Sequence, residues 1–401
     1  MPTLLQINTT ANWGSTGKIA EQIGLQVMNN GWQSIIAYGY YENPSKSKLI
    51  QVGSKWSVRW HRKMSKYWKG DGRASKCATR KLVEQIKEIK PDIIHLHNIH
   101  GIYLNYPILF EYLNSIDTPV VWTMHDCWTF TGRCAHFNTV NCTRWQHGCG
   151  KCPALKLYPK TKIDFSAENF ELKRKLFTAK HNIVLVPVSD WLKELVAQSM
   201  LKEHRCITIH NGIDIDSFKP TTIDSLPGTS NKHLILGVAS QWGESKGLVD
   251  FYKLREKLDA NTYDITLIGL NDEQIANLPA GITGIRRTQN VSELAAYYTH
   301  ASVFVNPTYS DNYPTTNLEA MACGTPVITY RTGGSPEALT PETGVVVEQG
   351  NIEALVEAIK ATCSKGKEYY HNACRRRAEE HFDKQMCFEK YLELYNELLT
   401  K

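Results

Sequence analysis

The stretch Val303–Leu339, which reads VFVNPTYSDNYPTTNLEAMACGTPVITYRTGGSPEAL, predicts a strand, a polar loop, a short helix and a second strand that ends in a glycine turn. Pro314 and the following Thr315–Asn317 mark the start of the helix, because proline suits a first turn and short polar side chains cap free N–H groups. Gly324 ends the helix, and the next strand begins at Pro326. A strand that leads through a loop to an exposed helix N-terminus predicts a site for an anion such as a phosphate group.

Two carboxylates flank the junction between this loop and this helix. Asp311 lies in the loop, and Glu319, eight residues later, lies at least one turn inside the helix. A carboxylate in that position can accept hydrogen bonds from hydroxyl groups. A solvated pair of surface charges is the alternative, but the neighbouring phosphate site favours a site for a sugar nucleotide.

The composition is typical of a globular protein with two domains. A chain of 401 residues is long enough for two cores, and contents of 42% hydrophobic and 21% charged residues argue against wholesale disorder. No apolar run approaches the roughly 18–20 residues of a membrane span. Met1–Thr10 has neither a basic region nor a cleavage site. We therefore expect a cytoplasmic protein.

The net charge of +6 hides an asymmetry between the two halves of the chain. The whole chain has 46 Lys and Arg and 40 Asp and Glu, and residues 1–186 contain 25 of the basic and 12 of the acidic residues. The rest of the chain therefore has 21 basic and 28 acidic residues. The two balances are therefore +13 and −7. Opposite signs predict two domains with different surfaces.

A basic segment with large apolar residues spans residues 55–81. It holds ten basic residues against the single acid Asp71, and its apolar residues recur at helical spacing: Trp56, Trp60, Met64 and Tyr67 or Trp68. Such a helix suits an anionic membrane surface, with its tryptophans at the level of the headgroups. We therefore expect peripheral binding to the inner face of the cytoplasmic membrane. A helix that packs by its aromatic side chains is the alternative, and nucleic acid is not expected because no fold for it is present.

Apolar strands alternate with helical patterns in both halves, which is typical of parallel sheets covered on both faces. Polar residues 219–231 are the best candidate for a linker. The expected strands are 4–7, 34–38, 92–96, 120–124, 183–188, 207–209, 234–238, 264–268 and 302–305, and the expected helices are 19–28, 81–90, 247–258, 292–298 and the last 25 residues.

These patterns predict an α/β protein with two Rossmann-like, doubly wound domains. The N-terminal domain is expected over residues 1–205 with a Cys-rich insert at 132–165, the C-terminal domain over 206–380, and a C-terminal helix over 381–401. Doubly wound domains bind ligands at the carboxyl ends of their strands, so the natural site is the cleft between them.

Five segments, in this order, resemble those of retaining glycosyltransferases of family 4. The segments are NWGSTGK at 12–18, TMHD at 123–126, HNGID at 210–214, ESKG at 244–247 and the stretch Val303–Leu339. The insert is most similar to those of colanic-acid, exopolysaccharide and O-antigen glycosyltransferases. The family has the GT-B fold, in which two Rossmann-like domains face each other across a cleft and the C-terminal helix crosses back to the N-terminal domain.

This resemblance implies a reaction and the residues that perform it. A sugar would pass with retention of configuration, without a metal, from a UDP or GDP donor to a lipid-linked glycan. Asp311 would lie near the donor sugar, Glu319 would bind the ribose hydroxyls, Lys246 would neutralise the departing diphosphate, and His125 would contact the transferred sugar. The other residues expected to bind the diphosphate or line the base are Thr315, Thr316, Asn317, Gln241, Gly269 and Arg287.

The loop Gly14–Lys18 is expected to approach the donor phosphates or sugar through Gly14, Thr16 and Gly17. It is not a nucleotide P-loop, because Ile19 follows Lys18 where a magnesium site needs Ser or Thr. A structural turn is the alternative.

Two residues depart from the family pattern. Asp311 stands where the family usually has Glu, and Gln241 stands where it usually has Arg. A fixed positive charge in a dry site can contribute several kcal/mol to the stability of a transition state. The second function to consider is therefore a catalytically weakened nucleotide-sugar-binding scaffold of a polysaccharide assembly complex.

The insert contains four cysteines whose last pair has the spacing C-x2-C. In a cytosolic protein such a set could hold a structural zinc ion, and His136 or His147 could replace a thiol. Two disulfides, which the cytosol disfavours, and free thiols packed in a loop are the alternatives. No cofactor is expected for catalysis. The four residues are Cys134, Cys142, Cys149 and Cys152.

Overall fold

The computed structural model describes residues 1–67, 72–223 and 226–400 and divides into two compact units. The first unit combines Met1–His210 with Phe388–Lys401, and the second is Asn211–Cys387. These boundaries lie five and seven residues beyond the expected ends of the two domains at 205 and 380. Trp68 and Asp71 of the basic segment lie outside the described residues.

The first unit is built on a seven-stranded sheet with the order β3-β2-β1-β4-β5-β6-β7, in which every neighbouring pair is parallel. The strand expected at 207–209 is instead Arg205–Cys206, and the chain after it stays beside β6 through single hydrogen bonds from Ile207 and Ile209. The strands are β1 Thr3–Asn8, β2 Gln33–Tyr38, β3 Lys48–Gln51, β4 Ile93–Leu96, β5 Val120–Met124, β6 Ile183–Pro187 and β7 Arg205–Cys206.

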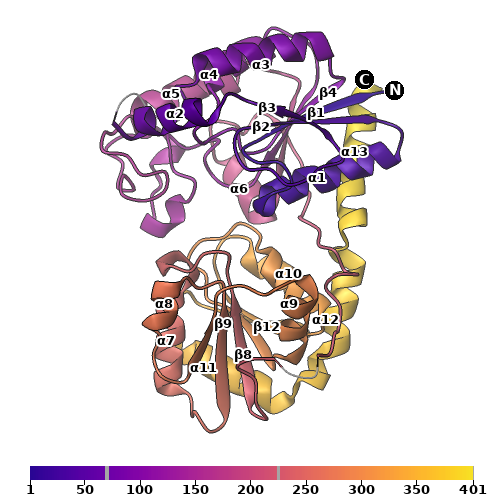
Figure 1. The fold of residues 1–401 in the computed structure, drawn as a ribbon. Coiled ribbons are helices and arrows are strands. Elements are labelled where there is room, and N and C mark those ends of the chain that lie inside the picture. The colour runs from indigo at the N-terminus through magenta and orange to yellow at the C-terminus, as the bar shows by residue number, and fades with distance from the viewer. Residues whose placement is uncertain (68–71, 224–225, 401) are drawn as a thin grey trace. The chain divides into compact units, whose positions relative to one another are not determined.

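Helices from both ends of the chain cover this sheet. In Figure 1, α13 at the end of the chain lies beside α1, and their apolar side chains share one core with β1, β4 and β6. The face predicted for the last helix is confirmed by buried Phe388, Tyr391 and Tyr395, whereas Leu399 is 39% exposed. The helices are α1 Gly14–Asn29, α2 Lys55–Tyr67, α3 Lys76–Ile89, α4 Tyr106–Leu113, α5 Ser166–Phe177, α6 Asp190–Ala197 and α13 Lys384–Leu399, which belongs to this unit from Phe388 onward.

The second unit has a six-stranded parallel sheet with the order β10-β9-β8-β11-β12-β13. Residues 219–231, expected as a linker, lie inside this unit, and their described part contains no helix or strand. The strands are β8 His233–Val238, β9 Tyr263–Ile268, β10 Ile282–Ile285, β11 Val303–Asn306, β12 Val327–Tyr330 and β13 Gly344–Val347.

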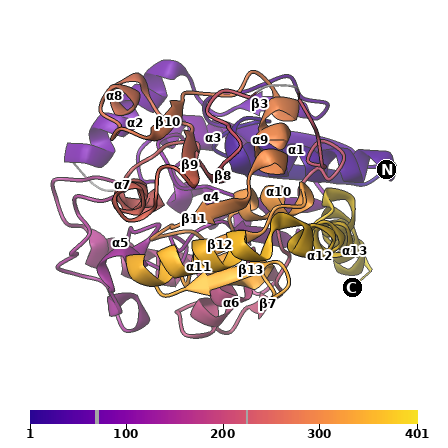
Figure 2. The ribbon, with the colours of Figure 1, turned by 90° about the horizontal axis from the view of Figure 1, so that it is seen from below.

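Helices cover the second sheet on both faces. On one face, α7 and α11 share a core with the strands, and Figure 2 shows α11 lying over β12 and β13. Of the remaining α-helices, α10 contacts both α9 and α12. The helices are η3 Glu244–Lys246, α7 Leu248–Lys257, α8 Asp272–Ala276, α9 Val291–His300, α10 Thr315–Ala322, η4 Ser335–Ala338, α11 Ile352–Lys365 and α12 Lys367–His381.

Both sheets have the doubly wound order predicted from the sequence. In each of them the strand order reverses at one point, between β1 and β4 in the first sheet and between β8 and β11 in the second. The loops that leave the two strands at such a point diverge and open a crevice, where doubly wound proteins bind ligands. Among the described residues, no helix combines the length and the apolarity that a membrane crossing requires.

Candidate functional site

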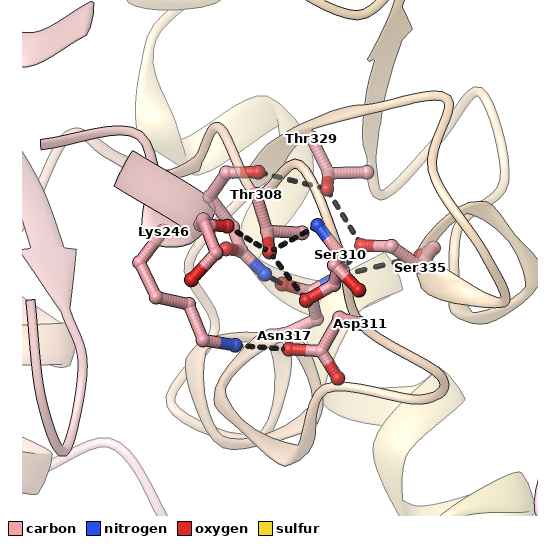
Figure 3. Close-up of polar contacts among 9 residues, drawn as sticks. Lys246, Thr308, Ser310, Asp311, Asn317, Thr329 and Ser335 are labelled. Carbon is pink, nitrogen blue, oxygen red and sulfur yellow. Dashed lines mark hydrogen bonds and ion pairs between the residues drawn. The ribbon is translucent and has the colours of Figure 1, made fainter. Parts of the chain in front are cut away.

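The loops after β8 and β11 meet at the reversal point of the second sheet. Lys246 Nζ lies 2.5 Å from Asp311 Oδ2, although the two residues are 65 positions apart (Figure 3). The Ser245 carbonyl accepts hydrogen bonds from the Tyr309 N–H at 2.9 Å and from the Thr308 hydroxyl at 3.2 Å. These two hydrogen bonds join the two loops, so the ion pair rests on a defined scaffold.

Gly247 explains how the two loops approach so closely. It lies in the left-handed region at φ +71°, directly after the single turn η3 that carries Lys246. A Cβ atom here would lie 2.2 Å from the Pro307 carbonyl oxygen, which is far inside van der Waals contact. The glycine in ESKG is therefore required for the position of Lys246.

The start of α10 is anchored by Asn317, whose side chain is fully buried. Its Oδ1 accepts from Asn306 Nδ2 at 2.8 Å, and its Nδ2 donates to Ser335 Oγ at 3.0 Å. Ser335 Oγ lies 2.7 Å from Thr329 Oγ1 (Figure 3). Two strands, β11 and β12, together with η4 thus hold the first turn of the helix beside the Lys246 loop.

The helix begins where the sequence predicts, but its cap is different. Pro314 occupies the N-cap position, and no side chain caps the helix. The Asn317 N–H donates to the Pro314 carbonyl at 3.1 Å, so the first turn is closed by the backbone. Thr315 and Thr316, both partly exposed, occupy the first two helical positions.

Glu319 is oriented by a buried tyrosine. Its Oε2 accepts a hydrogen bond of 3.0 Å from the hydroxyl of Tyr298 on α9. Burial raises the pKa of Tyr298 well above its usual range, so the hydroxyl stays protonated and donates. The sequence analysis missed Tyr298, because it lies on a helix that carries no motif.

The other expected donor-binding residues follow the carboxyl ends of β8, β9 and β10. Gln241 is exposed in the loop after β8, and Arg287 is exposed two residues after β10. Gly269 follows β9 directly and is left-handed at φ +102°, with its hypothetical Cβ only 1.7 Å from the Ala239 carbonyl oxygen. All three therefore lie at the same edge of the sheet as Lys246, and Gly269 has a structural role there.

In the first unit, His125 follows β5 and is held by a chain of hydrogen bonds. Its Nε2 lies 3.1 Å from His97 Nδ1, and His97 Nε2 lies 3.0 Å from Gln6 Oε1. Gln6 Nε2 donates to the Ala20 carbonyl, so Gln6 Oε1 is the acceptor of the His97 proton. His97 Nδ1 then accepts from His125 Nε2–H, which makes Nδ1 the unprotonated nitrogen of His125.

Burial keeps these histidines neutral. It lowers the pKa of His125 to about 4 and that of His97 well below its ordinary value of 6.5. His125 is thus a neutral hydrogen-bonding group at pH 7 and carries no positive charge. The sequence motif TMHD contains His125, but its two supporting residues come from β1 and the end of β4 and were not predicted.

The loop Gly14–Lys18 forms the first turn of α1 and does not project as a free loop. Gly14 starts the helix at φ +65°, and the Thr16 hydroxyl accepts a hydrogen bond of 3.3 Å from Asn8. A Cβ atom on Gly17 would lie 2.6 Å from Thr10 Oγ1. These residues follow the carboxyl end of β1, at the reversal point of the first sheet.

A cavity of about 300 Å³ opens in the first unit beside α2. Its lining contains the cationic side chains Arg62, Lys66 and Lys160 and the aromatic Trp128. His100, also in the lining, pairs with Asp126 at 2.7 Å. Burial raises the pKa of Asp126, but His100 outweighs it and leaves that pKa at about 2. The sequence analysis did not predict this cavity, although its basic segment supplies two of the cations.

Helix α2 turns its tryptophans outward. Trp56 is 75% exposed and Trp60 is 59% exposed, whereas Val58, His61 and Ser65 form its buried side. The alternative in which the tryptophans pack into the protein is therefore wrong for this helix.

Comparisons with known proteins all point to glycosyltransferases. The family described as Glycosyltransferase Family 4 matches residues 34–217, and the one described as Glycosyl transferases group 1 matches residues 232–365. WcaC of Escherichia coli (strain K12), named for colanic acid biosynthesis, is 27% identical over 77% of each chain. The capsular polysaccharide biosynthesis glycosyltransferase CapM of Staphylococcus aureus is 25% identical over 54% of this chain and 62% of its own.

Among solved structures, sucrose-phosphate synthase from Thermosynechococcus elongatus superposes with a TM-score of 0.73 at 17% identity and covers 100% of both chains. At this identity the likeness shows the fold alone, and that fold is GT-B. Together with the two matched families, which span most of both units, it leads to one conclusion. The chain belongs to the family-4 glycosyltransferases.

Proposed function

We propose that the protein is a retaining, metal-independent glycosyltransferase that moves a sugar from a UDP or GDP donor to a lipid-linked glycan of a bacterial surface polysaccharide. The observation that carries this proposal is the Lys246–Asp311 pair at the reversal point of the second sheet. An ammonium group, two carboxylates and a helix start converge there, as a sugar diphosphate requires.

The donor would be held by groups with separate tasks. The ammonium of Lys246 offsets the charge of the diphosphate, and the first turn of α10 supplies N–H groups at Thr315 and Thr316. Glu319, oriented by Tyr298, accepts from the ribose hydroxyls. Because Lys246 contacts Asp311 at 2.5 Å, the diphosphate shares the ammonium with this carboxylate.

The reaction needs positioning and positive charge more than a general base. In retaining transfer, the acceptor hydroxyl attacks from the face that the diphosphate leaves, and a phosphate oxygen takes its proton. Neutral His125 can accept a hydrogen bond at Nδ1 from a hydroxyl of the transferred sugar without adding charge. Lys246 stabilises the negative charge that develops on the leaving group.

Features of the first unit support an anionic acceptor at a membrane surface. Arg62, Lys66 and Lys160 in the lining of the 300 Å³ cavity suit the phosphate groups of a lipid carrier. The exposed Trp56 and Trp60 on the adjoining basic helix suit the headgroup region of an anionic membrane. A soluble acceptor would need neither feature.

The first experiment is thermal stabilisation of the protein by UDP-, GDP-, ADP- and CDP-sugars and the free nucleoside diphosphates. One base should raise the melting temperature, since a ligand at about 100 times its Kd adds about 2.7 kcal/mol of stability. Lys246→Ala should weaken that rise and lower transfer about 100-fold to 1,000-fold. Lys202→Ala, at an exposed lysine of the first unit, is the matched control. A panel without any rise contradicts the donor site.

A nucleotide-sugar-binding scaffold with weakened catalysis is the second candidate, favoured by exposed Gln241 and by the shorter carboxylate of Asp311. Slow hydrolysis of the donor without acceptor separates the two functions, because a binding protein should show none above background. Gln241→Arg adds the family's usual cation. A gain in hydrolysis with this variant supports the weakened site, whereas a loss indicates that the site is built around glutamine.

A further inference from the structure

Two of the four cysteines of the insert are in contact, and the other two lie near them. All four are described residues, and no three of their sulfurs lie within 4.8 Å of one another, so an ion bound by all four would draw the other thiols toward this pair. Cys134 Sγ lies 3.8 Å from Cys152 Sγ. Cys149 has Cys142 and Cys152 as electrostatic neighbours, and Cys134 has Cys149 and Cys152. All four are free thiols, and 3.8 Å is far beyond the roughly 2.0 Å of a disulfide bond. The structure thus disfavours the two-disulfide alternative.

The separation of Cys134 and Cys152 suits two ligands of one metal ion. Zinc–sulfur bonds of about 2.3 Å in a tetrahedron place the sulfurs about 3.8 Å apart. Packed neutral thiols can reach a similar separation, so the distance alone does not decide. The surroundings of the sulfurs distinguish the two cases.

Backbone N–H groups point at two of the sulfurs. Gly132 N–H donates to Cys149 Sγ at 3.2 Å, and the backbone of Ala154 hydrogen-bonds to Cys152. The second bond joins residues two positions apart, directly after the C-x2-C pair. Bonds of this kind stabilise thiolates and orient them as ligands. Asp164 fixes the same turn by accepting from the Cys152 N–H at 2.7 Å.

Two buried cations lie beside the thiols. Arg133 is 2% exposed, donates to the Ala154 carbonyl at 3.0 Å and also hydrogen-bonds to Cys152. Lys173 is 1% exposed, donates to the Trp128 and Thr131 carbonyls, and acts electrostatically on Cys149. Buried cations need negative charge nearby. Asp164 supplies negative charge to Arg133, and a zinc ion with four thiolates, which carries a net charge of −2, would add to it.

The insert also needs a cross-link. Within residues 132–165 the regular elements are two short 3-10 helices, Phe137–Val140 and Arg144–Gln146. Even so, the insert forms part of a binding surface: Lys160 lines the 300 Å³ cavity, and the Lys162 N–H donates to the Lys66 carbonyl on α2 at 3.2 Å. Long irregular segments keep one conformation only when side chains or a metal hold them.

We propose that Cys134, Cys142, Cys149 and Cys152 bind one structural zinc ion that holds the insert in place beside the cavity and α2. The zinc site lies in the first unit and the candidate donor site lies in the second, so the zinc proposal can be tested independently of the transferase reaction.

The first test is the zinc content of the whole chain, purified without chelators and measured by inductively coupled plasma mass spectrometry. We expect about one zinc ion per chain, and much less in Cys152→Ser and Cys142→Ser. Cys77→Ser, at an exposed cysteine on α3, is the matched control and should keep its zinc. Less than about a tenth of a zinc ion per wild-type chain overturns the proposal.

A spectroscopic test covers the case in which a serine variant misfolds. Cobalt(II) added to zinc-depleted wild-type protein should produce thiolate-to-cobalt charge-transfer bands and the strong visible bands of a tetrahedral site. Cys77→Ser should keep these bands, and Cys142→Ser, checked for its fold by circular dichroism, should change them. Cobalt bound without charge-transfer bands, or an unchanged spectrum in Cys142→Ser, contradicts the four-thiolate site.

Discussion

At the scale of single residues, glycines set how closely the loops of the second unit approach one another. Gly247 and Gly269 both have positive φ angles, and each faces a carbonyl oxygen where a side chain would begin. The local sequence could not show that these two positions need glycine, because the residues that they face, Pro307 and Ala239, come from other loops. Gly247 belongs to the ESKG motif, but glycine is required there because of a contact with Pro307, which lies 60 residues later in the chain.

Gly269→Ala should destabilise the protein by about 3 kcal/mol or more, because the Cβ would overlap the Ala239 carbonyl and the backbone is left-handed. Gly243→Ala is the matched control, since nothing lies within 4 Å of its Cβ and its backbone is extended. Thermal unfolding of both variants measures the difference. Equal melting temperatures would show that the chain near Ala239 relaxes freely.

At the scale of elements, α2 and α10 show that helical spacing and a proline at a helix start predict where a helix lies, although the side-chain cap expected for α10 is absent. The helix at α2 was predicted from its spacing, and the structure adds that Trp56 and Trp60 face outward. The start of α10 was predicted from Pro314, whereas its anchoring through Asn317 was not. The partners of Asn317 come from β11, β12 and η4, so no local pattern contains them.

The double variant Trp56→Ala, Trp60→Ala should lower flotation with anionic vesicles several-fold, because exposed tryptophans on a basic helix insert at the headgroups. Tyr369→Ala, which removes an aromatic side chain that is 61% exposed on α12, serves as the control. Vesicles of neutral lipid should bind less of the wild-type protein. Equal binding to both kinds of vesicle would count against a membrane role for α2.

At the scale of the whole molecule, the first unit is assembled from the two ends of the chain. The hydroxyl of Tyr395 on α13 forms a 2.6 Å hydrogen bond with His95 Nδ1, and the Tyr391 hydroxyl lies 2.9 Å from Thr123 Oγ1. His95 Nε2 in turn lies 2.7 Å from the same threonine. The last helix therefore completes a buried polar network as well as an apolar core.

Tyr395→Ala should cost about 3–5 kcal/mol of stability, since it removes a large buried side chain and leaves His95 without this partner. Leu399→Ala, on the same helix but 39% exposed, should change stability by less than about 0.5 kcal/mol. Urea unfolding followed by tryptophan fluorescence is suitable, because nine of the ten tryptophans lie within residues 1–210. Similar losses in both variants would argue against the packing described for α13.

The first unit should also lose stability on acidification from pH 6.5 toward pH 4. Burial lowers the pKa of His61 and His125 to about 4, and those of His95 and His97 well below 6.5. In that pH window the unfolded chain binds protons that the folded chain does not, which lowers stability by about 1.4 kcal/mol per pH unit for each group. Above pH 6.5 these groups are neutral in both states and contribute no slope.

Urea unfolding between pH 7.5 and pH 4.5 measures this dependence. His61→Gln should reduce the slope of the free energy of unfolding against pH by the contribution of one proton, about 1.4 kcal/mol per pH unit. His300→Gln, at an exposed histidine of the second unit, should leave this slope unchanged. A stability that stays level across the window, or a slope untouched by His61→Gln, contradicts the assignment.

The sequence by itself determined the class of fold, most of the strands and helices, and the residues that carry the family motifs. Apolar runs of strand length, helical periodicity, and glycine and proline at element ends are local signals, and each element forms largely from its own residues and their burial. Asp311, Glu319, Lys246 and His125 were predicted as site residues differently, from their positions in motifs that resemble those of the family.

Only the tertiary structure decided which of these residues meet. The contact of Lys246 with Asp311, the support of His125 by His97 and Gln6, and the contact of Cys134 with Cys152 all join separate parts of the chain. Such contacts depend on strand order, loop length and the free volume at each close approach, which local periodicity does not encode. The order β10-β9-β8-β11-β12-β13 places the loops after β8 and β11 side by side, and that is why the candidate donor site exists.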